Sequence, residues 1–576
     1  MSGAVAWSDC INGEGRIPQV TPADLQTSLH ALATALVERR REQGAEVSLE
    51  LAPADVVIER PKLREHGDWA SSIALRLAKP LGMPPRQIAD ELAAGLADVP
   101  GVASAEVAGP GFINVRLEAG AAGALARTIV EAGGAFGSGD ALAGRVVNLE
   151  FVSANPTGPL HIGHTRWAAL GDSLGRVLRA AGAEVATEFY INDAGNQMDT
   201  FAASVLAAIT GAPAPENGYR GAYIDDLGRR VLEQRPDLLE LPADEQLVIV
   251  REGAYRIQLD EIRASLERFN VHFDVWFSER TLHATGEQGR SAIDLAVDRL
   301  REQGHVFDRD GAVWVRTTDF GDDKDRVIRR ANGVYTYFAA DAAYYLDKGD
   351  RGFEHKIYLL GADHHGYVHR LKALAGAAGD DPDRDIEVLI GQLVSVDGAR
   401  LSKRAGNIIE LDDLQAWLGT DALRYTLARY PADSPLAIDP EVLQRRTNDN
   451  PVFYVQYAHA RTAAVARNAA SVGVDRSTFV PELLDHESES ALLGALQEFP
   501  RIVAQAAELR EPHRIARYIE ELAGLFHRWY DTCRVLPLGD EPVGDLQRTR
   551  LWLNDATGTV LRNGLGLIGV SAPERM

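Results

Sequence analysis

The sequence contains little cysteine, no long apolar run and no recognisable leader, and each absence excludes a class of protein. With only Cys10 and Cys533, far apart in a chain of 576 residues, it cannot form a disulfide framework or a four-cysteine zinc site. No apolar run approaches the ~20 residues that a membrane span requires. Residues 1–20 lack the basic and apolar regions of a secretory signal. We therefore expect a soluble, cytoplasmic protein with no membrane partner and no zinc.

Lysine is also scarce, whereas acidic residues are abundant. Seven of the 60 basic residues are lysines and none follows Lys403, a bias that a general preference for arginine largely explains. The 83 acidic residues give a formal net charge of −23. Such a charge argues against a simple polyanion binder, because a basic face is the usual footprint of nucleic-acid contact. It does not exclude local basic stripes.

The amino-terminal part of the chain combines helical and strand patterns. Residues 1–20 show no period and are interpreted as an extension. Within residues 21–120, helical spacing covers 22–40, 67–79 and 85–97, and strand patterns cover 55–60, 103–107 and 112–117. These patterns predict a small α+β domain, which ends in a glycine-rich linker at 133–144.

The central part, residues 140–440, repeats one unit that consists of an apolar strand, a loop and a helix. The run VVNLEFV at 146–152 is typical of a buried parallel strand, and a helical pattern follows from about 162 to 180. Further strands are predicted at 184–191, 356–361 and 387–396. This alternation predicts a multidomain α/β protein with a doubly wound parallel, Rossmann-like catalytic sheet. A more polar stretch at about 212–335 is interpreted as an insertion between the halves of the sheet. From 441 to 576 only helical spacing remains, which predicts a C-terminal α-helical bundle.

The stretch ANPTGPLHIGH, residues 154–164, follows the first predicted strand of this sheet and opens a helix. Open α/β sheets bind their ligands at the carboxyl ends of the strands. A helix N-terminus attracts anions through its free N–H groups and its dipole. His161 and His164 could therefore donate to phosphate oxygens, and Gly163 lets a flat ring approach the backbone. The alternative is an ordinary pair of capping or surface histidines.

A second polar cluster, DGARLSKRAGN at 397–407, follows the predicted strand at 387–396. Asp397 and Gly398 favour a tight turn. The basic side chains of Arg400, Lys403 and Arg404 suit the charge that develops on a leaving polyphosphate. Taken alone, the cluster is equally compatible with a solvated basic turn.

Together, the two clusters resemble the paired signatures of class I aminoacyl-tRNA synthetases. HIGH at 161–164 matches the first signature, and RLSKR at 400–404 is similar to the second, which is usually written KMSKS. Ser402 and Lys403 match it, whereas Arg400, Leu401 and Arg404 depart from it. The resemblance implies that Lys403 contacts pyrophosphate, and it leaves the role of Arg400 open.

Further motifs, in order from about residue 21 to Met576, resemble arginyl-tRNA synthetases in particular. They are PKLREHGDWAS (61–71), GPGFINV (109–115), NLEFVSANPTGPLHIGH (148–164), YINDAGNQ (190–197), FDVWFSE (273–279), GDDKDRV (321–327), TYFAADAAYYLDK (336–348), GADHHGY (361–367), DALRY (421–425) and NPVFYVQYAHAR (450–461). The first two resemble the amino-terminal tRNA-binding domain of that family. DALRY is close to the signature of its anticodon-binding domain, which residues 441–576 would form.

The resemblance also implies roles for individual residues. Glu150 and Asp341 are carboxylates suited to a guanidinium group, and with Asn155, Tyr337 and His364 they would bind arginine. The ATP-binding motif would comprise Ala154, Asn155, Pro156, Thr157, Gly158, Pro159, Leu160, His161, Ile162, Gly163, His164, Ser402 and Lys403, with His161, His164 and Lys403 as the catalytic residues. The alternatives are a helix-face hydrogen-bond pair for Tyr337 and Asp341, and a solvated strand end for Glu150.

The implied reaction is the ATP-dependent attachment of L-arginine to tRNA(Arg), through an arginyl-adenylate. Positioning and charge stabilisation would carry it without a protein nucleophile. Mg²⁺ would accompany the ATP, with no protein metal site assigned, and the family resemblance implies a monomer. The bundle would read the anticodon with Arg461, Arg514, Arg517 and Arg528 and with the aromatic residues Trp529 and Tyr530, although core packing is the better explanation for these aromatics.

Three other functions remain as alternatives at this stage. A metal-dependent hydrolase could use His364, His365 and His369, but only Asp363 adds to such a shell. An HxGH-type adenylyltransferase that does not act on tRNA would leave the long C-terminal bundle unexplained. A non-catalytic RNA-binding relative would leave Glu150, His161, His164 and Lys403 unexplained.

Overall fold

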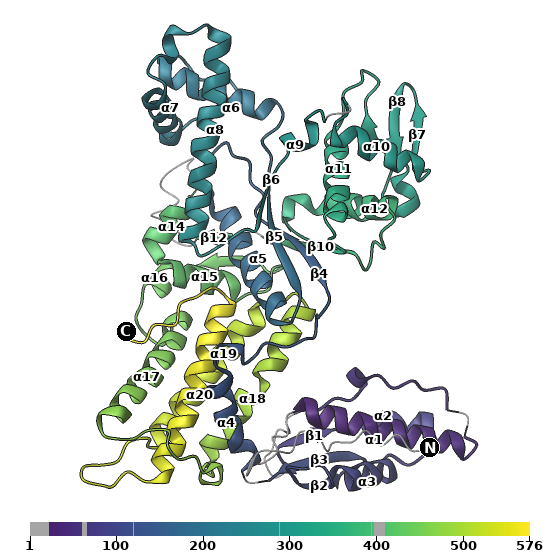
Figure 1. Ribbon diagram of the computed structural model, residues 1–576, viewed down its shortest axis with the longest axis vertical. Helices are drawn as coiled ribbons and strands as arrows, with labels where there is room; N and C mark the ends of the chain where they lie inside the picture. The colour runs from purple at the N-terminus through teal and green to yellow at the C-terminus, as the bar shows by residue number, and fades with distance from the viewer. Residues whose placement is uncertain are drawn as a thin grey trace.

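The computed structural model describes residues 22–45, 47–59, 61, 66–118, 120–286, 289–392, 394–396 and 409–576 (Figure 1). The predictions for residues 1–20 and for the cluster at 397–407, with Ser402 and Lys403, lie outside the described residues. In the described part of the chain, no helix is long and apolar enough to cross a membrane.

The amino-terminal unit packs three helices against a small antiparallel sheet with its own core. Its elements are α1 (Pro22–Glu42), η2 (Pro53–Asp55), β1 (Trp69–Ser71), α2 (Ile73–Leu81), α3 (Pro85–Leu96), β2 (Val102–Ala108) and β3 (Phe112–Leu117), with strand order β1-β3-β2. Leu25, Leu77, Ile88 and Ile113 lie in the core. The prediction of an α+β arrangement here is confirmed.

Two details of the prediction for this unit are wrong. The described residues of the predicted strand 55–60, which are 55–59, belong to no named strand, and an isolated bridge joins Glu59 to Ala70. The helix predicted from residue 67 begins at Ile73, because the segment before it pairs with β3 instead. Gly67 has a φ of 95°, and a Cβ there would lie 2.6 Å from the carbonyl oxygen of Val115. This close backbone approach requires glycine, two residues before β1 begins at Trp69.

The central sheet has five parallel strands in the order β11-β10-β4-β5-β6. The strands are β4 (Val146–Glu150), β5 (Glu184–Ile191), β6 (Val275–Ser278), β10 (His355–Gly361) and β11 (Ile386–Gly391). The chain fills one half of the sheet outward from β4 and then the other half from β10, so the predicted doubly wound fold is confirmed. The direction of winding reverses between β4 and β10, the position at which such sheets bind ligands.

The two faces of the sheet differ in character because side chains alternate along each strand. Val147 and Leu149 of β4 face the core that contains α5 (Ile162–Ala180), whose bounds match the predicted helix. Asn148 and Glu150 face the opposite side, which α11 (Tyr337–Asp350) covers. The side under α11 is therefore rich in buried polar groups, and it carries the candidate site.

The predicted insertion at about 212–335 is not a single unit, because β6 lies inside that range and belongs to the central sheet. Before β6, a helical unit forms from α6 (Asn196–Thr210), α7 (Ala222–Gln234), η5 (Leu238–Glu240) and α8 (Ala243–Arg268). After β6 come α9 (Arg280–His283), α10 (Ala292–Glu302), β7 (Val306–Arg309), β8 (Ala312–Val315), η6 (Thr317–Phe320) and β9 (Arg326–Arg329). Figure 1 shows the two units at separate places above the sheet.

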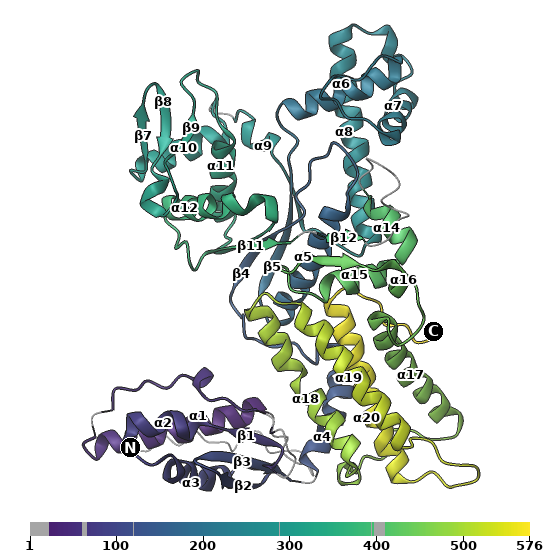
Figure 2. The ribbon, with the colours of Figure 1, turned by 180° about the vertical axis from the view of Figure 1, so that it is seen from behind.

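The last part of the chain is largely helical. After η7 (Ala362–Tyr367), α12 (Val368–Ala378) and β12 (Val394–Val396), the described elements are α14 (Leu411–Leu418), α15 (Thr420–Ala428), β13 (Leu436–Ile438), α16 (Pro440–Leu443), α17 (Pro451–Ser471), η8 (Pro481–Leu483), α18 (Glu487–Glu508), α19 (His513–Thr532) and α20 (Asp545–Leu567). From α16 onward all of these elements are helices, as predicted for residues 441–576. The predicted strand 387–396 is split, because β12 pairs with β13 rather than extending β11. A helix that the sequence patterns did not predict, α4 (Ala121–Ala132), is followed by η4 (Gly133–Ala135) and packs against α18 and α20 (Figure 2).

Candidate functional site

The two histidines of HIGH cap the amino-terminal end of α5. His161 is the N-cap residue, and its Nδ1 accepts a hydrogen bond from Gly163 N at 3.1 Å. His164 Nδ1 accepts one from His161 N at 3.3 Å. Burial lowers the pKa of His161, and burial together with the charge of His161 lowers the pKa of His164 to about 3. Both rings are therefore neutral near pH 7, and each keeps its Nε2 for a further hydrogen bond.

The flanks of the two signatures lie side by side. Leu411 N donates to Leu160 O at 2.8 Å, and Ile162 N donates to Ile409 O at 2.9 Å. His161 and Glu410 form a β-bridge between these bonds. The segment that directly follows the cluster 397–407 is thus fixed to the start of α5, even though the cluster itself lies outside the described residues.

Arg166, which the sequence patterns did not single out, fastens α5 to the other flank of that cluster. Its side chain is fully buried. Its Nη1 donates to Gln392 O at 3.1 Å and to Ser434 O at 2.7 Å, and its Nη2 donates to Pro431 O at 2.7 Å. Arg166 therefore ties the helix that begins with HIGH to the backbone just before β12 and just before β13.

The loop between β4 and α5 is stiff and carries Ser153 and Asn155. Val152 and Ser153 have φ of 68° and 43°, a left-handed conformation that costs non-glycine residues free energy and is common at functional sites. Ser153 Oγ donates to Glu150 Oε1 at 3.1 Å and accepts from Tyr190 N at 3.2 Å. Asn155 Nδ2 donates to Gln197 Oε1 at 2.9 Å. The turn formers of the motif thus bring Asn155 to the rim while Ser153 supports Glu150.

Glu150 is buried and paired, so the alternative of a solvated strand end is wrong. Its side chain lies at the carboxyl end of β4, and the residue is 7% exposed. Its Oε2 lies 2.6 Å from Nζ of Lys348, a residue of α11 that the sequence patterns did not identify.

Asp341 lies on α11 and accepts a hydrogen bond from Tyr367 Oη at 3.1 Å. Burial raises the pKa of Asp341 to about 7, and the charges of Glu279 and Glu150 contribute in the same direction. Tyr337 is 75% exposed, one turn before Asp341. The partner of Asp341 is Tyr367, which contradicts the interpretation of Tyr337 and Asp341 as a helix-face pair.

A third carboxylate, Glu279, completes the cluster, although the sequence patterns gave it no role. It follows β6 and is 5% exposed, and burial raises its pKa. Tyr190 lies at the end of β5, between the strands that lead to Glu150 and Glu279. Burial and the charges of Glu279, Asp341 and Glu150 raise its pKa. The missed signal was the motif FDVWFSE, whose strand was hidden in the presumed insertion.

His364 is exposed in η7, and its ring centroid lies 6.0 Å from that of Tyr367. His369 is also exposed. Among the described residues, no three His, Cys, Asp or Glu side chains are grouped as a metal site. The side chains of Asp363 and His365, which the hydrolase alternative needs, lie outside the described part.

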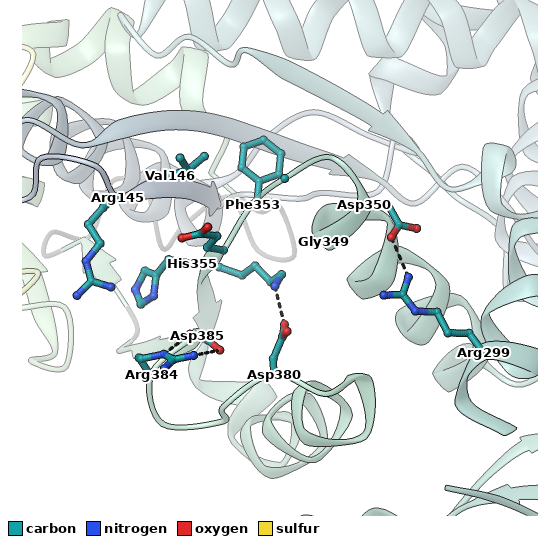
Figure 3. Close-up of a pocket in the computed structure, with 13 residues that line it drawn as sticks. Arg145, Val146, Arg299, Gly349, Asp350, Phe353, His355, Asp380, Arg384 and Asp385 are labelled. Atoms are coloured by element: carbon teal, nitrogen blue, oxygen red, sulfur yellow. Dashed lines mark hydrogen bonds and ion pairs between the residues drawn. The ribbon is translucent and has the colours of Figure 1, made fainter. Parts of the chain in front are cut away.

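A cavity of about 620 Å³ opens at the other end of the sheet, beside the amino ends of β4 and β10 (Figure 3). Arg145, Arg299, Lys356, Asp380 and Arg384 are among its lining residues. Its charges are largely matched within the chain, since Lys356 Nζ lies 2.7 Å from Asp380 and Arg299 Nη1 lies 2.8 Å from Asp350. None of the predicted site residues lines it.

Family models match three parts of the chain. "Arginyl tRNA synthetase N terminal domain" matches residues 25–117, "tRNA synthetases class I (R), catalytic domain" matches 242–423, and "DALR anticodon binding domain" matches 455–576.

Whole-length relatives and solved structures agree with these matches. The chain is 62% identical to the arginine–tRNA ligase of Renibacterium salmoninarum over 557 residues, which cover 97% of this chain and 100% of the relative. It is 61% identical to that of Micrococcus luteus over 560 residues, covering 96% and 100%. A putative arginyl-tRNA synthetase from Campylobacter jejuni superposes with a TM-score of 0.71 at 31% identity, covering 80% of this chain and 100% of that one. Thermus thermophilus arginyl-tRNA synthetase shares the fold, with a TM-score of 0.71 at 24% identity, covering 95% and 99%.

Proposed function

The chain belongs to the arginyl-tRNA synthetase family, and we propose that the cluster at the switch point of its central sheet is where it selects and activates arginine. The enzyme is an arginine–tRNA ligase (EC 6.1.1.19), which joins L-arginine to its tRNA at the expense of ATP. The HxGH-type adenylyltransferase and the non-catalytic relative are thereby set aside.

The reaction proceeds in two balanced steps. A carboxylate oxygen of arginine attacks the α-phosphorus of ATP, a P–O bond forms, and pyrophosphate leaves with the electrons of the broken P–O bond. A terminal ribose hydroxyl of the tRNA, the 2′-hydroxyl by class resemblance, then attacks the carbonyl carbon of the adenylate. An ester bond forms, the hydroxyl loses its proton, and AMP leaves. Neither step needs a nucleophile from the protein.

Arginine recognition rests on the gathered carboxylates. Asp341, which is half-buried, and Glu279, which is buried, offer acceptor oxygens that suit the five N–H donors of a guanidinium group. Glu150 and Asn155 lie on the strand and loop that lead to α5, so they would hold the amino-acid end towards the ATP. Tyr337 and His364, both exposed, would cover the pocket from α11 and η7.

ATP would lie along the motif from Ala154 to His164. The neutral rings of His161 and His164 would donate from Nε2 to phosphate oxygens, at a helix end whose dipole favours negative charge. By resemblance, Ser402 and Lys403 would stabilise the leaving pyrophosphate. Mg²⁺ would neutralise part of the phosphate charge, held by phosphate oxygens and water, because histidine and lysine nitrogens are poor ligands for this ion.

The tRNA would span several domains, which we propose to be residues 21–120, 140–440 and 441–576. In the bundle, the guanidinium of Arg461 lies 4.6 Å from the ring centre of Tyr457 and 4.8 Å from that of Tyr530, on α17 and α19. Tyr530 is 41% exposed and could stack on a base, whereas Trp529 is fully buried and belongs to the core. We further propose that the enzyme acts as a monomer in the cytoplasm, where its tRNA is charged.

The single observation that carries this assignment of the pocket is the placement of Glu150 at the end of β4 and Glu279 after β6, on the two strands that flank Tyr190 of β5. The charges of both, with that of Asp341, raise the pKa of Tyr190. The assignment is tested by ATP–pyrophosphate exchange with each of the twenty amino acids, with and without tRNA. We expect exchange with arginine alone, and only when tRNA is present. Exchange without tRNA would remove the coupling but keep the function, whereas no exchange with any amino acid would refute the assignment of the site.

A further inference from the structure

The face of the sheet beneath α11 places two glutamates side by side. Side-chain alternation brings Glu150 of β4 and Glu188 of β5 to the same face, and the register pairs them directly across the two strands. Both are buried, at 7% and 0% exposure. Like charges directly opposite each other destabilise a sheet, so each carboxylate requires a cation.

Two cationic side chains, Lys348 near the end of α11 and Arg351 directly after it, form ion pairs with these glutamates. Arg351, the residue after α11, donates to both oxygens of Glu188, at 2.8 and 2.9 Å, and Tyr344 Oη adds a third bond at 2.6 Å. Although burial opposes ionisation of Glu188, these bonds hold its pKa below the usual value. Arg351 is therefore committed to Glu188, and Lys348 is left to pair with Glu150.

Lys348 is held in one position. Its side chain is fully buried, and its Nζ lies 4.4 Å from the ring centre of Tyr344 and 4.0 Å from that of Tyr358. Glu150 is held equally, since Lys348 takes one carboxylate oxygen at 2.6 Å and Ser153 takes the other at 3.1 Å. The pair is thus a fixed unit and not an adjustable surface contact.

Because Lys348 pairs with Glu150 and Arg351 pairs with Glu188, the four carboxylates of the pocket differ in whether a cation neutralises them. Of the four carboxylates, Glu150 and Glu188 have cations of their own on or beside α11. Asp341 accepts a hydrogen bond from Tyr367, and Glu279 contacts His283. Neither carboxylate is paired with Lys348 or Arg351. Lys348 and Asp341 lie seven residues apart on α11, so they share one side of the helix.

We propose that Lys348 is a positioning residue for arginine selection: it cancels and orients Glu150, so that the negative charge facing the guanidinium is that of Asp341 and Glu279. This inference rests on the proposed function of the site. It makes the net charge of the pocket, and not only its shape, a property that Lys348 sets.

The test compares the acid limb of kcat/KM for arginine in four variants and the parent enzyme, by tRNA-dependent exchange. Lys348→Met removes a positive charge, so the limb moves to higher pH by about half a unit or more, and KM for arginine rises about tenfold while kcat changes less. Glu150→Gln leaves Lys348 uncompensated, so the limb moves to lower pH. Lys348→Met with Glu150→Gln restores the parental limb, and Lys348→Arg keeps it.

If Lys348 sets the charge of the pocket, the acid limb of kcat/KM shifts in opposite directions in Lys348→Met and Glu150→Gln. If Lys348 only packs, the substitutions change thermal stability and do not shift the limb in opposite directions. Folded variants with unshifted limbs, or with limbs that shift in the same direction, would overturn the proposal. Should Lys348→Met fail to fold, the downward shift in Glu150→Gln and its reversal in the double variant decide the question. A parent enzyme that does not use arginine refutes the proposed function instead, so the two failures are separable.

Discussion

At the scale of single residues, the carboxylate of Asp341 gives the site its pH dependence. Burial, with Glu279 and Glu150, raises its pKa to about 7, while Tyr367 and Arg370 act in the opposite direction. The protonated group carries no charge for a guanidinium, so kcat/KM for arginine, which reports the free enzyme, should fall as the pH drops through that value. Bound arginine favours the charged form, so the acid limb of kcat should lie at lower pH.

Asp341→Asn should remove this limb and lower kcat/KM for arginine by about 100-fold, since a buried charge pair is lost. Asp350→Asn, at the exposed end of the same helix, is the matched control and should keep both the rate and the limb. Rate profiles from pH 5.5 to 9 make the comparison. An acid limb that survives in Asp341→Asn would assign the ionisation to another group.

Single residues also show the limit of prediction from the sequence. Glu150, Asp341, His161 and His164 were identified because they stand in motifs with a family resemblance. Lys348 was not, although it ends one of those motifs, because its role depends on the register that sets α11 over β4. Pairing between a helix and a strand almost two hundred residues away leaves no local pattern.

At the scale of elements, α5 depends on a close approach to β11. Gly391 ends β11, and a Cβ there would lie 1.2 Å from Cη2 of Trp167 on α5. Gly391→Ala must therefore displace the tryptophan or the helix, which we expect to destabilise the catalytic domain by about 1–3 kcal/mol. Because α5 begins with His161 and His164, kcat should fall as well.

The matched control is Gly349→Ala in α11, where an added Cβ meets nothing within 4 Å. It should be neutral or stabilise by up to about 1 kcal/mol, because alanine is the better helix former. Thermal unfolding and kcat measured together separate the two glycines. Equal effects of both substitutions would show that the contact between Trp167 and Gly391 is not what fixes α5.

Elements were predicted well where local patterns are strong. The strands at 146–150, 184–191 and 355–361 and helix α5 follow from continuous apolar runs or from helical periodicity. β6 was missed because its four residues, VWFS, are too few to show a period and lie in a polar stretch. β1 was taken for the start of a helix because its pairing with β3 is a tertiary choice.

At the scale of the whole molecule, the DALRY segment joins the sheet to the helical bundle. Arg424, fully buried on α15, forms an ion pair with Asp172 of α5. It also donates to the carbonyl oxygens of Phe269 at 2.9 Å and of Ile568 at 3.3 Å. Gly569, with a φ of 70°, makes room for it, since a Cβ there would lie 2.0 Å from Arg424 Nη2. One side chain thus contacts the catalytic helix, the segment after α8 and the end of the chain.

Arg424→Met should therefore cost about 3–5 kcal/mol, because it removes a buried charge, leaves the carboxylate of Asp172 with Arg176 as its ion-pair partner, and deprives the carbonyls of Phe269 and Ile568 of a donor. Asp172→Leu with Arg424→Met removes both charges and should recover part of that loss, although the carbonyls stay unpaired. Arg445→Met breaks an exposed pair with Asp449 and should cost less than about 1 kcal/mol.

The contacts of Arg424 between the central sheet and the helical bundle should also affect function. If Arg424 makes the sheet and the bundle unfold together, Arg424→Met should split one calorimetric transition into two, and arginylation of tRNA should suffer more than binding of arginine. A single transition at a lower temperature would show that Arg424 stabilises the fold without coupling its parts. Retention of the parental transition would mean that the remaining contacts of α5 with α14, α15, α18 and α20 suffice to hold the two bodies together.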